Sequence, residues 1–201
     1  ISNNVCRSAS STDHIIQTTW IKNSTICGNT LSGGSGKGIL LDDESNDCVV
    51  DGNYITDVGQ EGIQLDLADN NIVSNNRIYD VDRVGIRVAN SSVSNLITAN
   101  FIKGAGRLTN NTYGCIELSG SANNNTSILD NIFRKFGSGN EALTPIIVTN
   151  TTPTGTKCTG NDFGTEWSTP ELGNYTWNNN ASISLGDSEF TASATATTAI
   201  G

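Results

Sequence analysis

The strongest constraint on the fold is an internal repeat of 23 to 31 residues, marked by one asparagine in each copy. A mostly apolar residue stands three positions before each marker, and another apolar residue stands two positions after it. Repeats of this length are typical of solenoids, in which one unit cannot bury its own apolar face and stacked neighbours share a core. The seven markers are Asn4, Asn29, Asn53, Asn76, Asn100, Asn131 and Asn161.

A second segment recurs in each copy, and it has the pattern of a short strand with two different faces. Gly62-Ile63-Gln64-Leu65 is representative: two apolar residues flank one variable residue. Side chains alternate along a strand, so the apolar pair points inward and the variable residue outward. The pairs predicted to point into the core are Ile39/Leu41, Ile63/Leu65, Ile86/Val88, Ile116/Leu118 and Ile146/Val148.

Composition agrees with short strands joined by turns. Only 35% of the 201 residues are hydrophobic, and 21 are glycine. Glycine and asparagine disfavour helix interiors and favour turns. We therefore predict an all-β fold, a right-handed parallel β-helix of about seven coils over residues 1–165, followed by a C-terminal cap and extended tail over residues 166–201. Successive coils are expected about 4.8 Å apart.

The asparagine column is expected to lie at a bend between strands. Asparagine tolerates the left-handed backbone conformation, and stacked amides can hydrogen-bond along a ladder. A weaker column of turn-forming residues stands six positions earlier, at Asn23, Asp47, Asn70, Ser94, Asn125 and Gly155.

The recurring Asn-x-Ile and Gly-Ile-x-Leu segments resemble the pectate-lyase-like parallel β-helix repeat over residues 1–165. That family includes pectate lyases, polygalacturonases, alginate epimerases, and bacteriophage tailspikes and capsule depolymerases. The resemblance implies a face that binds or cuts polysaccharide. The Asp42-Asp43 pair resembles the paired aspartates of polygalacturonases, but their Gly-His-Gly and Arg-x-Lys motifs are missing. The pectate lyase and alginate epimerase motifs are not recognisable either.

Carboxylates on the outward side of the Gly-Ile-x-Leu strands are the candidate catalytic groups, because hydrolysis of a glycosidic bond usually uses two. We predict Asp42, Asp66 and Glu117 as catalytic. The spacing leaves two pairings open, because Asp42 and Asp66 stand on adjacent coils whereas Asp66 and Glu117 stand two coils apart. The alternative is that these groups belong to a solvated sheet face. The predicted substrate-binding residues are Gln64, Arg87 and Asp43.

No cofactor is expected, and no metal ligand is assigned. Calcium remains the one candidate ion, because hard oxygen ligands are available, although no spaced calcium loop is evident. The oxygen ligands are those of Asp42, Asp43, Glu44, Asp66 and Asp69.

Charge and cysteine content limit the kinds of partner and of cross-link that we expect. The net charge of -9 argues against nucleic acid, which needs a basic face. Five cysteines cannot all pair within one chain, and we interpret them mainly as small buried thiols. We expect no membrane span and no signal peptide, since neither a long apolar run nor a basic leader is visible.

The leading functional hypothesis is a bacteriophage tailspike-type protein that binds bacterial surface polysaccharide, with hydrolysis as a candidate reaction. The resemblance then implies a homotrimer in the virion tail or an extracellular location. Two alternatives stay open: a secreted polysaccharide lyase or hydrolase, and a non-catalytic adhesin or structural β-helix.

Overall fold

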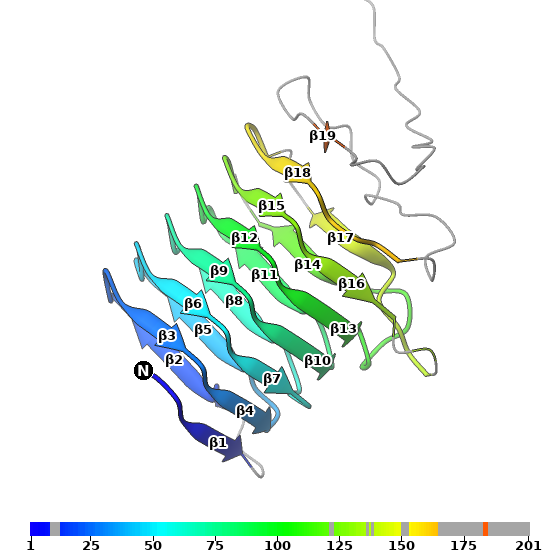
Figure 1. Cartoon of the computed structure of the whole chain (residues 1–201), viewed down its shortest axis with the longest axis horizontal. Coiled ribbons are helices and arrows are strands. Elements are labelled where there is room, and N and C mark those ends of the chain that lie inside the picture. The colour runs from blue at the N-terminus through cyan, green and yellow to red at the C-terminus, as the bar shows by residue number, and fades with distance from the viewer. Residues whose placement is uncertain are drawn as a thin grey trace, which may run out of the picture.

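The chain winds into a parallel β-helix. The computed structural model describes residues 1–8, 13–120, 123–135, 137, 139–149, 153–164 and 183–184. Within these ranges every regular element is a β-strand. All paired strands are parallel, and they form three sheets that run along one common axis (Figure 1). The predicted right-handed parallel β-helix is confirmed.

Each coil contributes one strand to each sheet. The first sheet contains β1 (Val5–Ser8), β4 (Thr30–Gly33), β7 (Tyr54–Thr56), β10 (Arg77–Val81), β13 (Phe101–Ala105) and β16 (Ile132–Arg134). The second sheet contains β2 (Ile16–Thr19), β5 (Ile39–Asp42), β8 (Ile63–Asp66), β11 (Ile86–Ala89), β14 (Gly114–Ser119) and β17 (Thr144–Thr149). The third sheet contains β3 (Thr25–Cys27), β6 (Val49–Asp51), β9 (Ile72–Ser74), β12 (Leu96–Thr98), β15 (Ser127–Leu129), β18 (Lys157–Thr159) and β19 (Ile183–Ser184).

The chain passes from the second sheet to the third and then to the first before the next coil begins. From β2, for example, it continues through β3 and β4 to β5. The described strands make about six coils, close to the seven that the asparagine markers predict. The difference arises because Asn4 precedes β2 and follows no strand of the second or third sheet, so it belongs to an incomplete coil.

The core is filled by aliphatic columns that stack in register. Ile16, Ile39, Ile63, Ile86, Ile116 and Ile146 are consecutive partners across the second sheet. All ten side chains predicted to point inward from this sheet are buried. Stacking therefore gives each coil the apolar contacts that it cannot make alone.

The marker asparagines form a continuous hydrogen-bonded ladder through the interior. Asn76 shows the repeating unit: its Nδ2 donates to Asn100 Oδ1 at 3.0 Å, and its Oδ1 accepts from Asn53 Nδ2 at 3.0 Å. The same link joins every consecutive pair from Asn4 to Asn161. Each side chain from Asn29 onward also accepts a bond from the backbone N–H of the preceding marker, as Asn76 does from Asn53 at 2.9 Å. The predicted amide ladder is confirmed.

The prediction that the marker asparagines themselves adopt the left-handed conformation is wrong. The left-handed residue is the one just before each marker, with φ between 53° and 68° in all seven cases. The bend is made there, and the marker uses its side chain to satisfy backbone groups inside it. The weaker column, six positions earlier, is left-handed throughout, with φ between 51° and 68°. These residues are therefore turn formers, as predicted.

The two longest insertions in the repeat form neighbouring loops. Their described parts run over residues 107–113 and 139–143, and they lead directly into β14 and β17 of the second sheet. Asn140 Nδ2 donates to the Arg107 carbonyl at 2.9 Å, and the Leu143 N–H donates to the Tyr113 carbonyl at 2.7 Å. The insertions therefore rise together beside the second sheet.

All five cysteines are free thiols. Cys48, Cys115 and Cys158 are buried, while Cys6 and Cys27 are partly buried. Burial raises the pKa of the Cys115 thiol strongly and that of Cys158 to about 12. Both behave as small apolar core residues, in agreement with the sequence interpretation.

Two further predictions concern a membrane span and the C-terminal segment. No helix among the described residues is long and apolar enough to cross a membrane. The C-terminal segment predicted for residues 166–201 lies outside the described residues, apart from β19, which pairs with β18 through Ile183 and Cys158.

Candidate functional site

The side of the second sheet opposite the core carries the predicted site residues, apart from Asp43, in two parallel rows, several members of which, such as Gln64 and Ser119, are buried. We call these rows the outer wall. The first row is Gln17, Leu40, Gln64, Arg87, Glu117 and Ile147; the second is Thr19, Asp42, Asp66, Ala89, Ser119 and Thr149. The register of these strands is the one that the repeat predicts. Alternation along each strand puts both rows on the face opposite the core.

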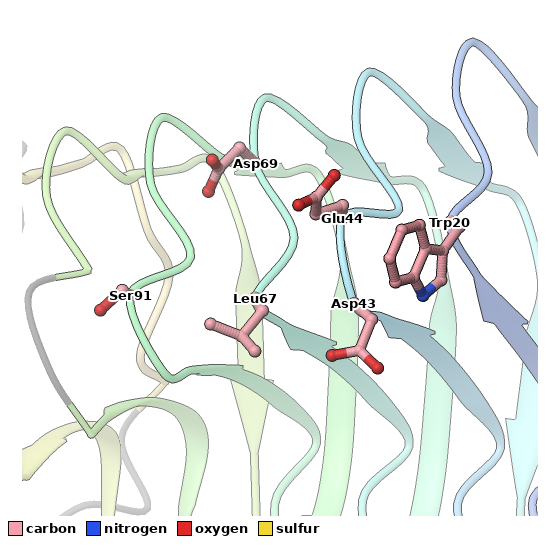
Figure 2. Close-up of a pocket in the computed structure, with 6 residues that line it drawn as sticks. All are labelled: Trp20, Asp43, Glu44, Leu67, Asp69 and Ser91. Carbon is pink, nitrogen blue, oxygen red and sulfur yellow. The ribbon is translucent and has the colours of Figure 1, made fainter.

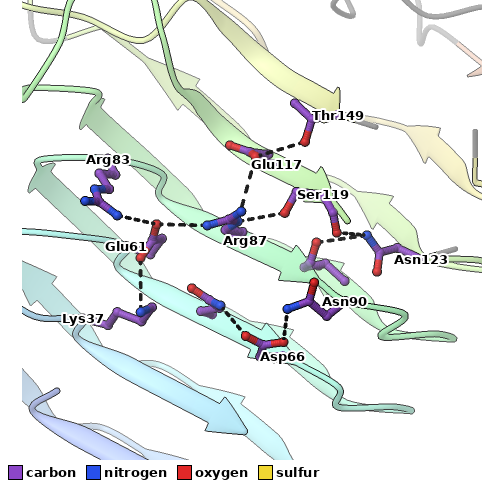
Figure 3. A network of polar contacts seen from close by, with 12 residues as sticks. Lys37, Glu61, Asp66, Arg83, Arg87, Asn90, Glu117, Ser119, Asn123 and Thr149 are labelled. Atoms are coloured by element: carbon purple, nitrogen blue, oxygen red, sulfur yellow. Dashed lines mark hydrogen bonds and ion pairs between the residues drawn. The ribbon is translucent and has the colours of Figure 1, made fainter. Parts of the chain in front are cut away.

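A buried carboxylate, Glu61, organises the cations of the outer wall (Figure 3). Its side chain is only 2% exposed and lies in the turn that leads into β8. Lys37 Nζ stands 3.7 Å from Oε2, and Oε1 is 3.5 Å from Arg87 Nη1 and 4.0 Å from Arg83 Nη1. With Glu117, which also lies near Arg87, two carboxyl groups face three cations, so this cluster beside the outer wall has a small surplus of positive charge.

Arg87 connects this cluster to Glu117. Its Nε donates to Ser119 Oγ at 2.8 Å and lies 3.9 Å from Glu117 Oε1. The guanidinium therefore spans from Glu61 on one coil to Ser119 and Glu117 on another (Figure 3). A planar group with several donors is suited to such a bridge, which a lysine could not reproduce.

Glu117 is the carboxyl group whose environment is most unusual on the outer wall. Its side chain is 12% exposed, and Thr149 Oγ1 donates to its Oε1 at 3.2 Å. Burial raises the pKa of Glu117 above its usual range, and the nearby Glu61 charge adds to this, although Arg87 and the Thr149 hydrogen bond act in the opposite direction. A carboxyl that keeps its proton to higher pH is the kind of group that serves as a general acid.

Asp66 is held by amides on both oxygens. Gln64 Nε2 donates to Oδ2 at 2.9 Å, and Asn90 Nδ2 donates to Oδ1 at 2.7 Å. These bonds fix the direction of the carboxylate (Figure 3). Asp66 is paired with Ala89, and Ala89 with Ser119, so Asp66 and Glu117 stand two coils apart as the sequence predicts.

Asp42 and Asp43 occupy different surroundings. Asp42 ends β5, next to the strand that Asp66 ends, and it accepts a hydrogen bond from Gln17 Nε2 at 3.4 Å. Asp43 follows it in a left-handed conformation, with φ of 39°, and lines a groove beyond the end of the strand. The structure thus brings Gln64, Asp66, Arg87 and Glu117 together, while Asp43 lies apart from them.

Sequence reasoning missed Glu61, Lys37 and Arg83. The signal for the first two was present, because Lys37 and Glu61 each immediately precede the glycine of a Gly-Ile-x-Leu segment in consecutive repeats. In a stack, that places opposite charges in one column. Arg83 comes from another position in its repeat, and its contact with Glu61 depends on the path of the turn.

No group of three or more histidine, cysteine, aspartate or glutamate side chains in the described ranges is arranged to hold a metal ion. The suggested calcium ligands are distributed over the C-terminal ends of β5 and β8 and the residues that follow them. Asp69, for example, already accepts the Val93 N–H at 2.8 Å.

Comparison with known protein families agrees with the coil geometry. Residues 1–133, from the first coil into β16, match the family described as the right-handed β-helix region. The chain belongs to this family. The match includes every residue of the predicted site, from Asp42 to Glu117. A search of curated proteins finds no significant match.

Two solved structures are similar to this chain. The A-module of a mannuronan C-5 epimerase from Azotobacter vinelandii is 15% identical, with a TM-score of 0.61. The alignment covers 91% of this chain and 57% of that one. Tailspike protein 2 of the Escherichia coli O157:H7 bacteriophage CAB120 is 13% identical, with a TM-score of 0.46 over 79% of this chain and 24% of that one. The chain therefore spans only part of each protein, and the likeness to the epimerase module concerns the fold.

Proposed function

We propose that this protein binds bacterial surface polysaccharide along the outer wall and hydrolyses it there, as a tailspike-type protein in a virion tail or outside the cell. The observation that carries the proposal is Glu117, a largely buried carboxyl with a raised pKa on the outward side of β14. Burying a carboxyl on an outward face brings no gain in core packing. A raised pKa, however, keeps the carboxyl protonated to higher pH, which a general acid requires.

In the proposed reaction Glu117 gives its proton to the glycosidic oxygen as the bond from that oxygen to the anomeric carbon breaks. Asp66 takes a proton from the water that attacks the same carbon. The strands that carry them lie two strand spacings, about 10 Å, apart, and Asp66 is in register with Ser119, two residues beyond Glu117, so the two carboxyl groups are well separated and leave room for the water. This arrangement favours inversion at the anomeric carbon over a covalent intermediate. Asp42, one coil further along, contacts the neighbouring part of the glycan.

A polyuronate lyase is the second candidate, and a specific feature favours it. Lys37, Arg83 and Arg87 surround Glu61, and with Glu117 counted three cations still face two carboxyl groups, which leaves positive charge available for the carboxylate of an acidic sugar. A lyase would use these cations to neutralise that carboxylate while a base removes a proton from the sugar ring. The fold likeness to a mannuronan epimerase is compatible with this alternative.

A reaction assay on defined polysaccharides separates these functions. The protein is incubated with a panel of bacterial capsule and O-antigen polysaccharides and with polyuronates. New reducing ends without ultraviolet absorbance of an unsaturated uronate are expected. Appearance of that absorbance would favour the lyase, and binding without cleavage would favour an adhesin. No binding to any polysaccharide in the panel would contradict the proposal.

We also propose that the protein acts as a homotrimer, as the resemblance to tailspikes implies. Sedimentation equilibrium of the intact chain is expected to give a mass three times that of the monomer at micromolar concentration. A mass equal to that of the monomer over the accessible concentration range would contradict the trimer and favour the secreted enzyme.

A further inference from the structure

A groove with an exposed tryptophan lies alongside the outer wall, where the chain leaves the strands of the second sheet. It has a volume of about 350 Å³ and is lined by Trp20, Asp43, Glu44, Leu67, Asp69 and Ser91 (Figure 2). These six residues come from four consecutive coils, so the groove runs along the axis of the β-helix. A polymer laid along that axis would pass over all of them in turn.

The groove continues the outer wall. Trp20 directly follows β2, Asp43 directly follows β5 and Leu67 directly follows β8. The residues just before them are Thr19, Asp42 and Asp66, which form the second row of the wall. A chain bound at Asp66 can therefore extend into the groove without leaving the surface.

Trp20 and Leu67 occupy backbone positions that do not suit them. Their φ angles are 63° and 51°, in the left-handed region that large apolar residues rarely adopt. Trp20 is 69% exposed and Leu67 is 48% exposed, so neither adds much to the core. Asparagine or glycine would fit both positions with less strain. Backbone strain that is not offset by packing of the side chain clusters at binding sites.

The chemistry of the lining suits an uncharged sugar. Trp20 offers a flat aromatic face on which a sugar ring can stack. Asp43 and Glu44 are exposed carboxylates and Asp69 is a half-buried one, and such oxygens accept hydrogen bonds from hydroxyl groups. No lysine or arginine is among the lining residues, so the carboxylate of a uronate would meet only like charges here.

We infer that this groove is a subsite for a neutral sugar of the polysaccharide, whose ring stacks on Trp20 while its hydroxyls bond to Asp43, Glu44 and Asp69. The inference rests on the proposed function and adds to it the class of sugar that binds in the groove beside the outer wall. The charge changes along the surface, from the cations around Glu61 to the acids around Trp20. The surface therefore fits a polymer that contains neutral units, rather than a pure polyuronate.

Calorimetric titration with two sets of oligosaccharides of matched length tests the inference. One set is neutral, cut from uncharged O-antigens, and the other consists of polyuronates. The wild type is expected to bind at least one neutral oligosaccharide. Trp20→Ala should raise the Kd of that oligosaccharide about tenfold or more, which corresponds to the loss of one stacked ring. Trp20→Phe should restore most of the affinity, because an aromatic face is retained.

Two controls separate loss of the subsite from loss of folding and from a general effect of charge. Trp20→Ala is expected to have a urea midpoint no lower than that of the wild type, since Trp20 is exposed. Asp51→Asn, which removes a charge from the third sheet, is expected to bind the neutral oligosaccharide with wild-type affinity. Unchanged affinity in Trp20→Ala, or binding confined to polyuronates, would overturn the subsite and leave the proposed function standing. Absence of binding to either set would overturn both.

Discussion

Replacing Asn76 by alanine is expected to reduce the free energy of unfolding by about 2–4 kcal/mol. The Asn76 side chain donates to the Val50 carbonyl at 2.9 Å and to Asn100 Oδ1 at 3.0 Å. It accepts from the backbone N–H and from Nδ2 of Asn53. Alanine would leave the buried N–H of Asn53 and the carbonyl of Val50 without partners, at a cost of roughly 1–3 kcal/mol each. Urea denaturation followed by circular dichroism measures the loss.

Asn4→Ala is the matched control, because Asn4 stands at the end of the same ladder. Its Nδ2 donates to Asn29 Oδ1 and to the Ser2 carbonyl, but the side chain is exposed. We expect a loss below about 1 kcal/mol, because the freed groups can bind water. Equal losses in Asn4→Ala and Asn76→Ala would show that the ladder adds nothing beyond single hydrogen bonds and would contradict its proposed role.

The ladder could be predicted because stacking turns a sequence period into a column in space. The repeat aligns Asn53, Asn76 and Asn100, and parallel strands in register then place their side chains next to one another. The backbone conformation of the bend could not be assigned in the same way. Gly52 and Asn75 precede two of the markers and take the left-handed conformation, but Ala99 takes it as well, and its residue type gives no such indication.

Replacing Glu117 by glutamine is expected to lower kcat for polysaccharide hydrolysis by about 10²- to 10⁴-fold, the usual contribution of a general acid. Glutamine has nearly the same shape, and its amide can still contact Arg87 and Thr149. It cannot, however, transfer a proton to the glycosidic oxygen. Initial rates of reducing-end release measure the effect, and the urea midpoint is expected to stay at or above the wild-type value, since a buried acid is replaced by a neutral group.

Two further variants show whether the loss is specific to the site. Asp66→Asn is expected to lose hydrolysis to a similar extent, because the amide cannot take a proton from water. Asp51→Asn, on the third sheet, changes a carboxylate that accepts from Ser74 and Asn75 away from the outer wall. It should leave kcat within about twofold of the wild type. Comparable losses in Asp51→Asn and Glu117→Gln would point to a general effect of charge or folding.

The candidate site was predictable as far as it depends on register. Asp66, Arg87 and Glu117 follow from alternation along each strand and from stacking between strands, and both are visible in the repeat. The repeat predicts which strand residues are buried in the core, but it does not predict the burial of residues in the turns. The depth of Glu61 depends on the turn that brings Arg83 over it, and the exposure of Trp20 depends on a left-handed bend that its residue type disfavours.

The position of the alkaline limb in the pH–rate profile tests the role of Glu117 most directly. Hydrolysis by the wild type should decline as pH rises through the raised pKa of Glu117, because the donor loses its proton. The positive charge of Arg87 lowers this pKa, while burial and Glu61 raise it. Arg87→Gln should therefore move the limb to higher pH, whatever its effect on the maximal rate. A limb that stays in place, or moves to lower pH, would contradict the assignment of Glu117 as the proton donor.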